Sequence, residues 1–196
     1  MKSNTTLRFL LTSAFCGFFA LASVHAERVI YKIDPVHSGV NFRIRHFINN
    51  VPGTFSRFEG EIHFDKSDPT KSKAVATIDL TSVDTRNSNR DDHLQQDDYF
   101  HTAEFPRMTF ESTRWEVVDE SNFKVTGNLS FLGRTNEVVL DVVFLGEMEG
   151  RGIIRSGWEG RTTIDRTQWG LTSGTPAVGR EVHIELNIQG HLVQGD

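Results

Sequence analysis

The sequence predicts an all-β protein, an antiparallel barrel or sandwich of eight to ten strands with one short helical insert. Apolar and polar residues alternate with period two along most of the chain, the pattern of half-buried strands. Short turn motifs separate these segments, and no helical pattern is long enough for a parallel crossover connection. Only Asn89 to Pro106 departs from the alternation. These observations favour one sheet that closes or folds on itself.

Residues 1–26 resemble an export signal rather than part of the fold. Lys2 and Arg8 precede an apolar run from Phe9 to Ala22, and small residues lead to a cleavage site near Ala26. The run of 14 residues is shorter than the roughly 20 that a membrane span needs. We therefore expect an exported, periplasmic protein without stable membrane insertion, whose single domain covers residues 27–196.

The predicted strands follow in chain order, each with one apolar face. The last strand, for example, alternates five aliphatic residues with His183, Glu185 and other polar side chains. A turn is expected at 49–53. The expected strands are 29–34, 40–46, 54–64, 74–80, 108–118, 123–131, 137–145, 153–164 and 181–192. The strand 137–145 is apolar on both faces, which predicts that it is covered on both, by a second subunit or by the helical insert.

The insert reads as a short helix or helical loop. Its first part lacks β-branched residues, begins at Asn89 in a good capping position and carries acids in the first turn. Glycines within strand patterns favour a barrel over a sandwich, because sharply coiled strands need residues that tolerate close approach. These glycines are Gly60, Gly127, Gly157, Gly160 and Gly190.

Composition argues against several classes of function. Removal of the leader leaves 19 basic and 26 acidic residues, a net charge of −7, which disfavours nucleic acid as a partner. The single cysteine, Cys16, lies in the leader, so the exported chain has no thiol nucleophile and no thiolate ligand. Motifs for a nucleophile elbow, phosphate loop or dinucleotide site are absent from the sequence. We predict no catalytic residues, no metal site and no cofactor.

The apolar faces are rich in aromatic side chains, with 15 phenylalanines in the chain. A barrel of about eight strands is either just filled by its side chains or holds one ligand. The residues alone do not decide between these interiors.

Several motifs resemble the YceI-like family. The insert contains Arg90-Asp91-Asp92-His93-Leu94 followed by Asp98-Tyr99-Phe100 and Phe105-Pro106, which is similar to that family's signature. The segments TSVDT (81–85), GVNFRIRHF (39–47), GTFSRFEGEIHF (53–64) and GNLSFLGRTNEVVL (127–140) resemble the same family in order and spacing. The family commonly has Phe where Tyr99 stands.

This resemblance implies a lipocalin-like β-barrel, often a homodimer, that binds an isoprenoid lipid such as a prenyl quinone or prenyl phosphate and has no catalytic residues. We expect three residues, Arg90, His93 and Tyr99, at the pocket mouth. The expected pocket-lining residues are Phe42, Ile44, Phe58, Ile62, Phe110, Phe123, Val125, Leu129 and Phe131.

Alternatives remain at this point. Arg90 could instead pair with Asp91 or Asp84, and His93 could serve only to fasten the insert. The barrel could be solid, which would suit a non-enzymatic stress-response or interaction protein. An enzyme acting on an isoprenoid or amide lipid is the third hypothesis.

Overall fold

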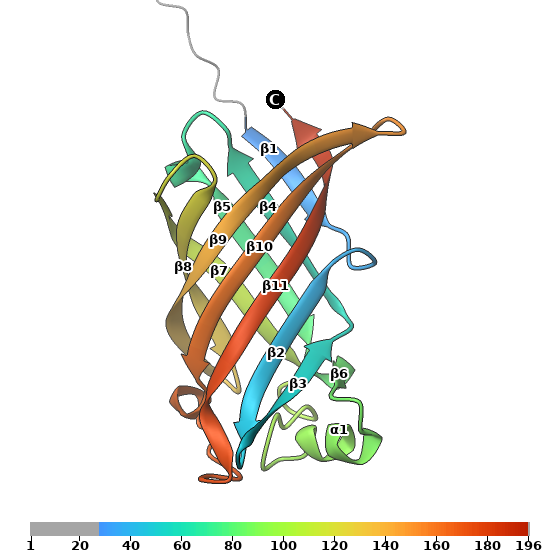
Figure 1. Cartoon of the computed structure of the whole chain (residues 1–196), viewed down its shortest axis with the longest axis vertical. Helices are drawn as coiled ribbons and strands as arrows, with labels where there is room; N and C mark the ends of the chain where they lie inside the picture. Colours follow the sequence, from blue (N-terminus) through green and yellow to red (C-terminus); the bar gives the residue numbers. More distant parts are fainter. Residues whose placement is uncertain (1–27, 196) are drawn as a thin grey trace, which may run out of the picture.

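A computed structural model describes residues 28–195, so the expected export signal lies outside the described residues. Within this range an 11-stranded antiparallel sheet closes on itself, as Figure 1 shows. The strands are β1 (Arg28–Ile33), β2 (Gly39–His46), β3 (Asn49–Phe55), β4 (Phe58–Asp65), β5 (Lys73–Asp79), β6 (Val83–Asp84), β7 (Arg107–Val117), β8 (Asn122–Phe131), β9 (Arg134–Gly150), β10 (Ile153–Asp165) and β11 (Val178–Gly195).

Eight of these strands form the closed barrel, which confirms the predicted fold class and excludes the sandwich. Their order is β1-β4-β5-β7-β8-β9-β10-β11, and β11 pairs with β1 to complete the ring. The remaining strands, β2, β3 and β6, extend from β11 at the end of the barrel that carries α1 (Ser88–Leu94) (Figure 1). The insert therefore lies beside one end of the barrel.

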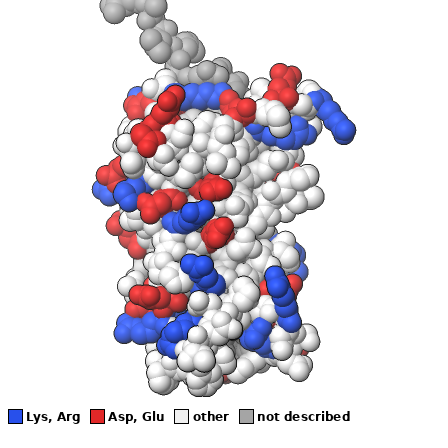
Figure 2. All heavy atoms as spheres, viewed as in Figure 1, with Lys and Arg blue, Asp and Glu red and all other residues white. Residues whose placement is uncertain are grey.

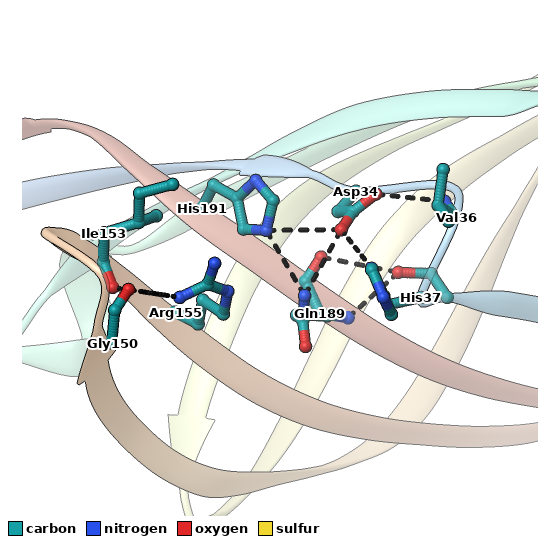
Figure 3. A network of polar contacts seen from close by, with 9 residues as sticks. Asp34, Val36, His37, Gly150, Ile153, Arg155, Gln189 and His191 are labelled. Atoms are coloured by element: carbon teal, nitrogen blue, oxygen red, sulfur yellow. Dashed lines mark hydrogen bonds and ion pairs between the residues drawn. The ribbon is translucent and has the colours of Figure 1, made fainter.

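The long strand β11 changes partners along its length. Its first part pairs with β2 as far as Asn187, and its last part pairs with β1 from Gly190 onward. Gln189, at the change, donates from Nε2 to Asp34 Oδ2 at 3.2 Å, and the same carboxylate oxygen lies 2.6 Å from Nδ1 of His37 (Figure 3). The hydrogen bond with His37 lowers the pKa of Asp34. These contacts join the loop between β1 and β2, which contains Asp34 and His37, to Gln189 on β11.

The turn expected at 49–53 is wrong. The chain turns two residues earlier, at Phe47 and Ile48, and residues 49–55 form β3. β3 pairs with β6 only at Thr54 and Phe55, so most of its outer edge is unpaired. Pro52 is tolerated there because an edge strand needs no donor on its open side.

The helical insert forms a single α-helix, but its cap differs from the expectation. Asn87, not Asn89, is the N-cap residue, and its side-chain oxygen accepts from the backbone N–H of Arg90 at 3.0 Å. Asp91 accepts from the backbone N–H of Thr85 at 2.9 Å, so this acid holds the preceding segment against the helix. The chain then continues through turns to β7.

Two glycines allow aromatic rings to lie close to the barrel wall. A Cβ atom at Gly127 would lie 2.5 Å from the ring of Phe110, and one at Gly53 would overlap the ring of Phe42. Aromatic side chains commonly pack over glycine on a neighbouring strand in this way. A larger residue at either glycine would therefore displace the ring.

Candidate functional site

An elongated apolar cavity of about 450 Å³ occupies the barrel interior. On β11 its lining runs from Val178 to Ile188; a bulge follows Val178, and the regular part from Val182 to Ile188 corresponds to roughly 20 Å of strand at about 3.3 Å per residue. It is therefore a long space, lined by several strands, and its residues include both the barrel core and side chains beside α1.

Eight of the nine residues expected to line a pocket do line this cavity: Phe42, Ile44, Phe58, Ile62, Phe110, Val125, Leu129 and Phe131. The ninth, Phe123, lies elsewhere. It is 2% exposed, and its ring packs against Phe64 and Trp115, with ring centroids 6.0 and 5.7 Å apart. The period-two pattern places Phe123 inside the barrel correctly, but its neighbours separate it from the cavity.

Aromatic side chains fill the barrel at the end remote from α1. Trp158 is the centre of this group, with Phe144 at 4.4 Å, Phe64 at 5.1 Å and Trp115 at 6.2 Å between ring centroids. Its indole N–H donates to Ser156 Oγ at 2.9 Å, which satisfies the buried donor. Trp115 and Trp158 also line the cavity, so the cavity ends against this aromatic group.

Polar side chains line the cavity at the α1 end. All three expected mouth residues, Arg90, His93 and Tyr99, are among them. Nε2 of His93 lies 3.2 Å from Asp98 Oδ2, and its ring is edge-on to Tyr99 with centroids 5.0 Å apart. The insert thus brings cation, imidazole and phenol groups to one end of a mainly apolar space.

Arg90 pairs with neither of the two acids that we considered. Its Nε donates to Thr85 Oγ1 at 2.7 Å, and its Nη2 donates to the Thr85 carbonyl at 2.6 Å. Asp91 also bonds to Thr85. The contacts of the Arg90 guanidinium are therefore to neutral oxygens, and no carboxylate within the described residues binds it directly.

Arg166 is a lining residue that sequence reasoning missed. It is only 2% exposed, and it donates from Nε to the Gly179 carbonyl and from Nη2 to the Ser173 carbonyl, both at 2.8 Å. Within the described residues, Nη1 has no hydrogen-bond partner and the guanidinium has no ion pair. Burial lowers the pKa of Arg166. No local sequence pattern reveals this burial, since residues 173–179 must fold over the side chain to produce it.

The other polar groups of the insert serve local contacts. His101 Nδ1 lies 3.5 Å from Glu104 Oε2. Across residues 28–195, His, Asp and Glu side chains do not gather in any group of three or more that could hold a metal ion.

The outer face of β9 carries apolar residues, as its sequence predicts. Val139 is 44% exposed and Leu145 is 62% exposed. α1 does not cover them, since it lies at the barrel end and contacts β6. Pairing with a second subunit stays a prediction.

None of the helices in the described range is long and apolar enough to cross a membrane.

The fold and the cavity define a lipocalin-like class of protein, a closed eight-stranded barrel with an elongated apolar interior and a polar mouth. The sequence matches the YceI-like domain over residues 31–190, and the chain belongs to this family. Protein YceI of Escherichia coli is 34% identical over 184 residues, which cover 92% of this chain and 94% of that protein.

Solved structures have the same fold. The YceI protein of Campylobacter jejuni superposes with a TM-score of 0.69 at 31% identity, covering 74% of this chain and 86% of that one. A polyisoprenoid-binding domain from Saccharophagus degradans, implicated in plant cell wall breakdown, gives a TM-score of 0.67 at 16% identity, covering 84% of this chain and 99% of that one. At 16% identity the second likeness concerns the fold alone.

Proposed function

We propose that this protein binds an isoprenoid lipid in its barrel and carries or stores it in the periplasm. The observation that carries the proposal is the shape of the cavity, which is elongated, lined mainly by apolar side chains, ended by aromatic residues and bordered by Arg90, His93 and Tyr99 beside α1. A linear apolar chain with one polar end has the matching shape. The polyisoprenoid-binding domain of similar fold supports this choice of ligand. The cavity also argues against a solid barrel.

The free energy of such binding comes mainly from the chain. One isoprene unit buries of the order of 100 Å², worth roughly 2.5 kcal/mol at about 25 cal/mol per Å². Ordering of the unit costs about 1 kcal/mol. At a net gain of about 1.5 kcal/mol per unit, about six units suffice for micromolar affinity, and we expect affinity to rise with chain length.

The headgroup that we propose is a hydrogen-bond acceptor. Arg166 and Arg90 supply guanidinium donors beside the cavity, and a quinone carbonyl or a phosphate oxygen can accept from them. Asp97 and Asp98 place two carboxylates on the same insert, which disfavours a phosphate relative to an uncharged quinone. We therefore favour a prenyl quinone.

The proposed role is binding without turnover. Asp91 and His93 are the insert groups best suited to proton transfer, but both make local contacts. Asp91 bonds to Thr85, and His93 bonds to Asp98. When the protein is incubated with a prenyl quinone or a prenyl phosphate, mass spectrometry should show that neither lipid has been converted. A product that disappears in Asp91→Asn or His93→Ala, with binding retained, would establish an enzyme instead.

The direct test is organic extraction of the protein, purified after expression of the full chain, followed by lipid mass spectrometry. We expect a copurifying prenyl lipid, and delipidated protein should take up added long-chain prenyl quinone in preference to a short-chain one. No copurifying prenyl lipid together with no uptake would refute the proposal. Export is tested separately, because the periplasmic fraction should contain a chain that begins near Glu27.

A further inference from the structure

The turn between β2 and β3 places two large apolar side chains in the most exposed position of a hairpin. Phe47 is 62% exposed and Ile48 is 102% exposed. They form the two-residue loop between the paired residues His46 and Asn49. Two-residue hairpin loops favour Asn-Gly or similar residues, and Phe47 has a positive φ of 52°, which is unfavourable for a bulky side chain. Turn formation therefore does not explain this residue choice.

The hairpin tip lies at the mouth of the cavity. His46, next to the turn, lines the cavity, as does Val51 in β3. The backbone N–H of Phe47 donates to the Ala177 carbonyl at 2.7 Å, which joins the turn to the loop before β11. We call residues 43–53 and 172–180 together the hairpin lip. In Figure 1 the hairpin and this loop lie at the same end of the barrel as α1.

The charge of the hairpin lip contrasts with that of the whole chain. Its two segments contain no Asp or Glu, but they contain Arg43, Arg45 and Arg180. Asp165 pairs with Arg180 at 2.6 Å, whereas Arg43 forms no ion pair within the described part of the chain. In Figure 2 the tip at this end of the molecule is largely uncharged, with Lys and Arg side chains close above it and some Asp and Glu side chains among them.

The helical insert, which also borders the mouth, is acidic. Residues 88–104, which contain α1, carry five acids and one arginine. An anionic surface would attract the hairpin lip and repel the insert, so these two parts of the mouth differ in the partner that they favour.

We infer that the hairpin lip docks on an anionic phospholipid bilayer, with Phe47 and Ile48 inserted at the interface and Arg43 and Arg45 facing the headgroups. This inference rests on the proposed function, since a lipid carrier must exchange its cargo with a membrane. Apolar burial at the interface and attraction to anionic lipid act together in such binding. Docking by this lip would bring the cavity mouth to the bilayer surface.

The test compares cosedimentation of the delipidated protein with two kinds of vesicle. One contains phosphatidylcholine and phosphatidylglycerol in equal parts, and the other contains phosphatidylcholine alone. We expect binding to the anionic vesicles, weakened by added salt because screening shortens the range of the attraction. Phe47→Asn with Ile48→Gly preserves turn chemistry and should reduce partitioning by about tenfold or more. Arg43→Gln should reduce it about fivefold.

The control changes two exposed apolar residues away from the mouth. Leu145 and Met148 are 62% and 70% exposed, and Leu145→Ser with Met148→Gln should bind vesicles as the unchanged protein does. Equal binding by the hairpin variant, or no vesicle binding by the unchanged protein, would overturn the inference. The inference would also be overturned if the hairpin variant lost dimerisation without any change in vesicle binding. In that case Phe47 and Ile48 would contact a second copy of the protein and not a membrane.

A vesicle-free measurement separates this inference from the proposed function. Uptake of a prenyl quinone from detergent solution should be the same in the hairpin variant and the unchanged protein. Failure of both to take up the quinone counts against the proposed function, whereas unchanged uptake with unchanged vesicle binding counts against the docking surface alone.

Discussion

Substitution of Val142 by Phe should shorten the cavity and weaken the binding of long-chain lipids selectively. Val142 lies on β9, lines the cavity and packs against the aromatic end of the core. Its cross-strand partners are Gly160 on β10 and Phe123 on β8, and the Leu186 side chain already covers Gly160, so a ring at position 142 cannot lie over that glycine. The added ring therefore occupies space that the far end of a bound chain would use.

The magnitude follows from the area of the displaced part of the ligand. If the ring displaces about one isoprene unit of order 100 Å², about 2.5 kcal/mol of burial is lost. About 1 kcal/mol of ordering cost is no longer incurred. The net loss of about 1.5 kcal/mol corresponds to about a tenfold rise in Kd.

The assay is titration of delipidated protein with prenyl quinones of increasing chain length. Val143→Phe is the matched control, because Val143 is the adjacent valine on the same strand and is not a lining residue. We expect the Kd of the long-chain quinone to rise about tenfold for Val142→Phe only, while the short-chain quinone binds both variants alike. If both variants lost the same affinity, or if the loss of affinity did not depend on chain length, the lipid chain would not extend toward the aromatic end of the barrel. Thermal unfolding of each variant checks that overpacking has not disrupted the barrel.

Two further predictions concern stability. The hydrogen bond from Thr167 and the pairing with Arg180 lower the pKa of Asp165 to about 2, below the ordinary 3.8. The ionised form of Asp165 therefore stabilises the fold above about pH 4. This contribution to stability is lost as the pH falls toward 2. Asp165→Asn should lower the free energy of unfolding by up to about 2 kcal/mol at pH 7, with the difference vanishing near pH 2 in urea titrations; a constant difference would contradict this account. Gly127→Ala should destabilise the barrel by about 1–3 kcal/mol, because its Cβ would overlap the Phe110 ring. Gly150→Ala, where the nearest atom lies at 3.6 Å, should change the denaturation midpoint little, and similar losses in both variants would remove the steric explanation.

Much of the strand pattern follows from local alternation. Period two correctly assigns inward positions such as Leu129 and Phe131, because neighbouring residues of a strand point to opposite faces. The expected turn at 49–53 is wrong because Asn, Pro and Gly indicate a turn only when no neighbouring strand offers pairing. Here β2 supplies that pairing.

By itself, the sequence determined an antiparallel all-β body, a short insert with Arg90, His93 and Tyr99, and the set of apolar residues that face inward. These properties depend on periodicity and on residue type, which are local. Tertiary structure alone decided that β11 has two successive partners, that Phe123 packs away from the cavity and that Arg166 is buried beside it. It also decided that the interior holds a cavity and that the rings of Phe42 and Phe110 lie over glycines of neighbouring strands. Such contacts join residues far apart in the chain, so no local pattern can specify them.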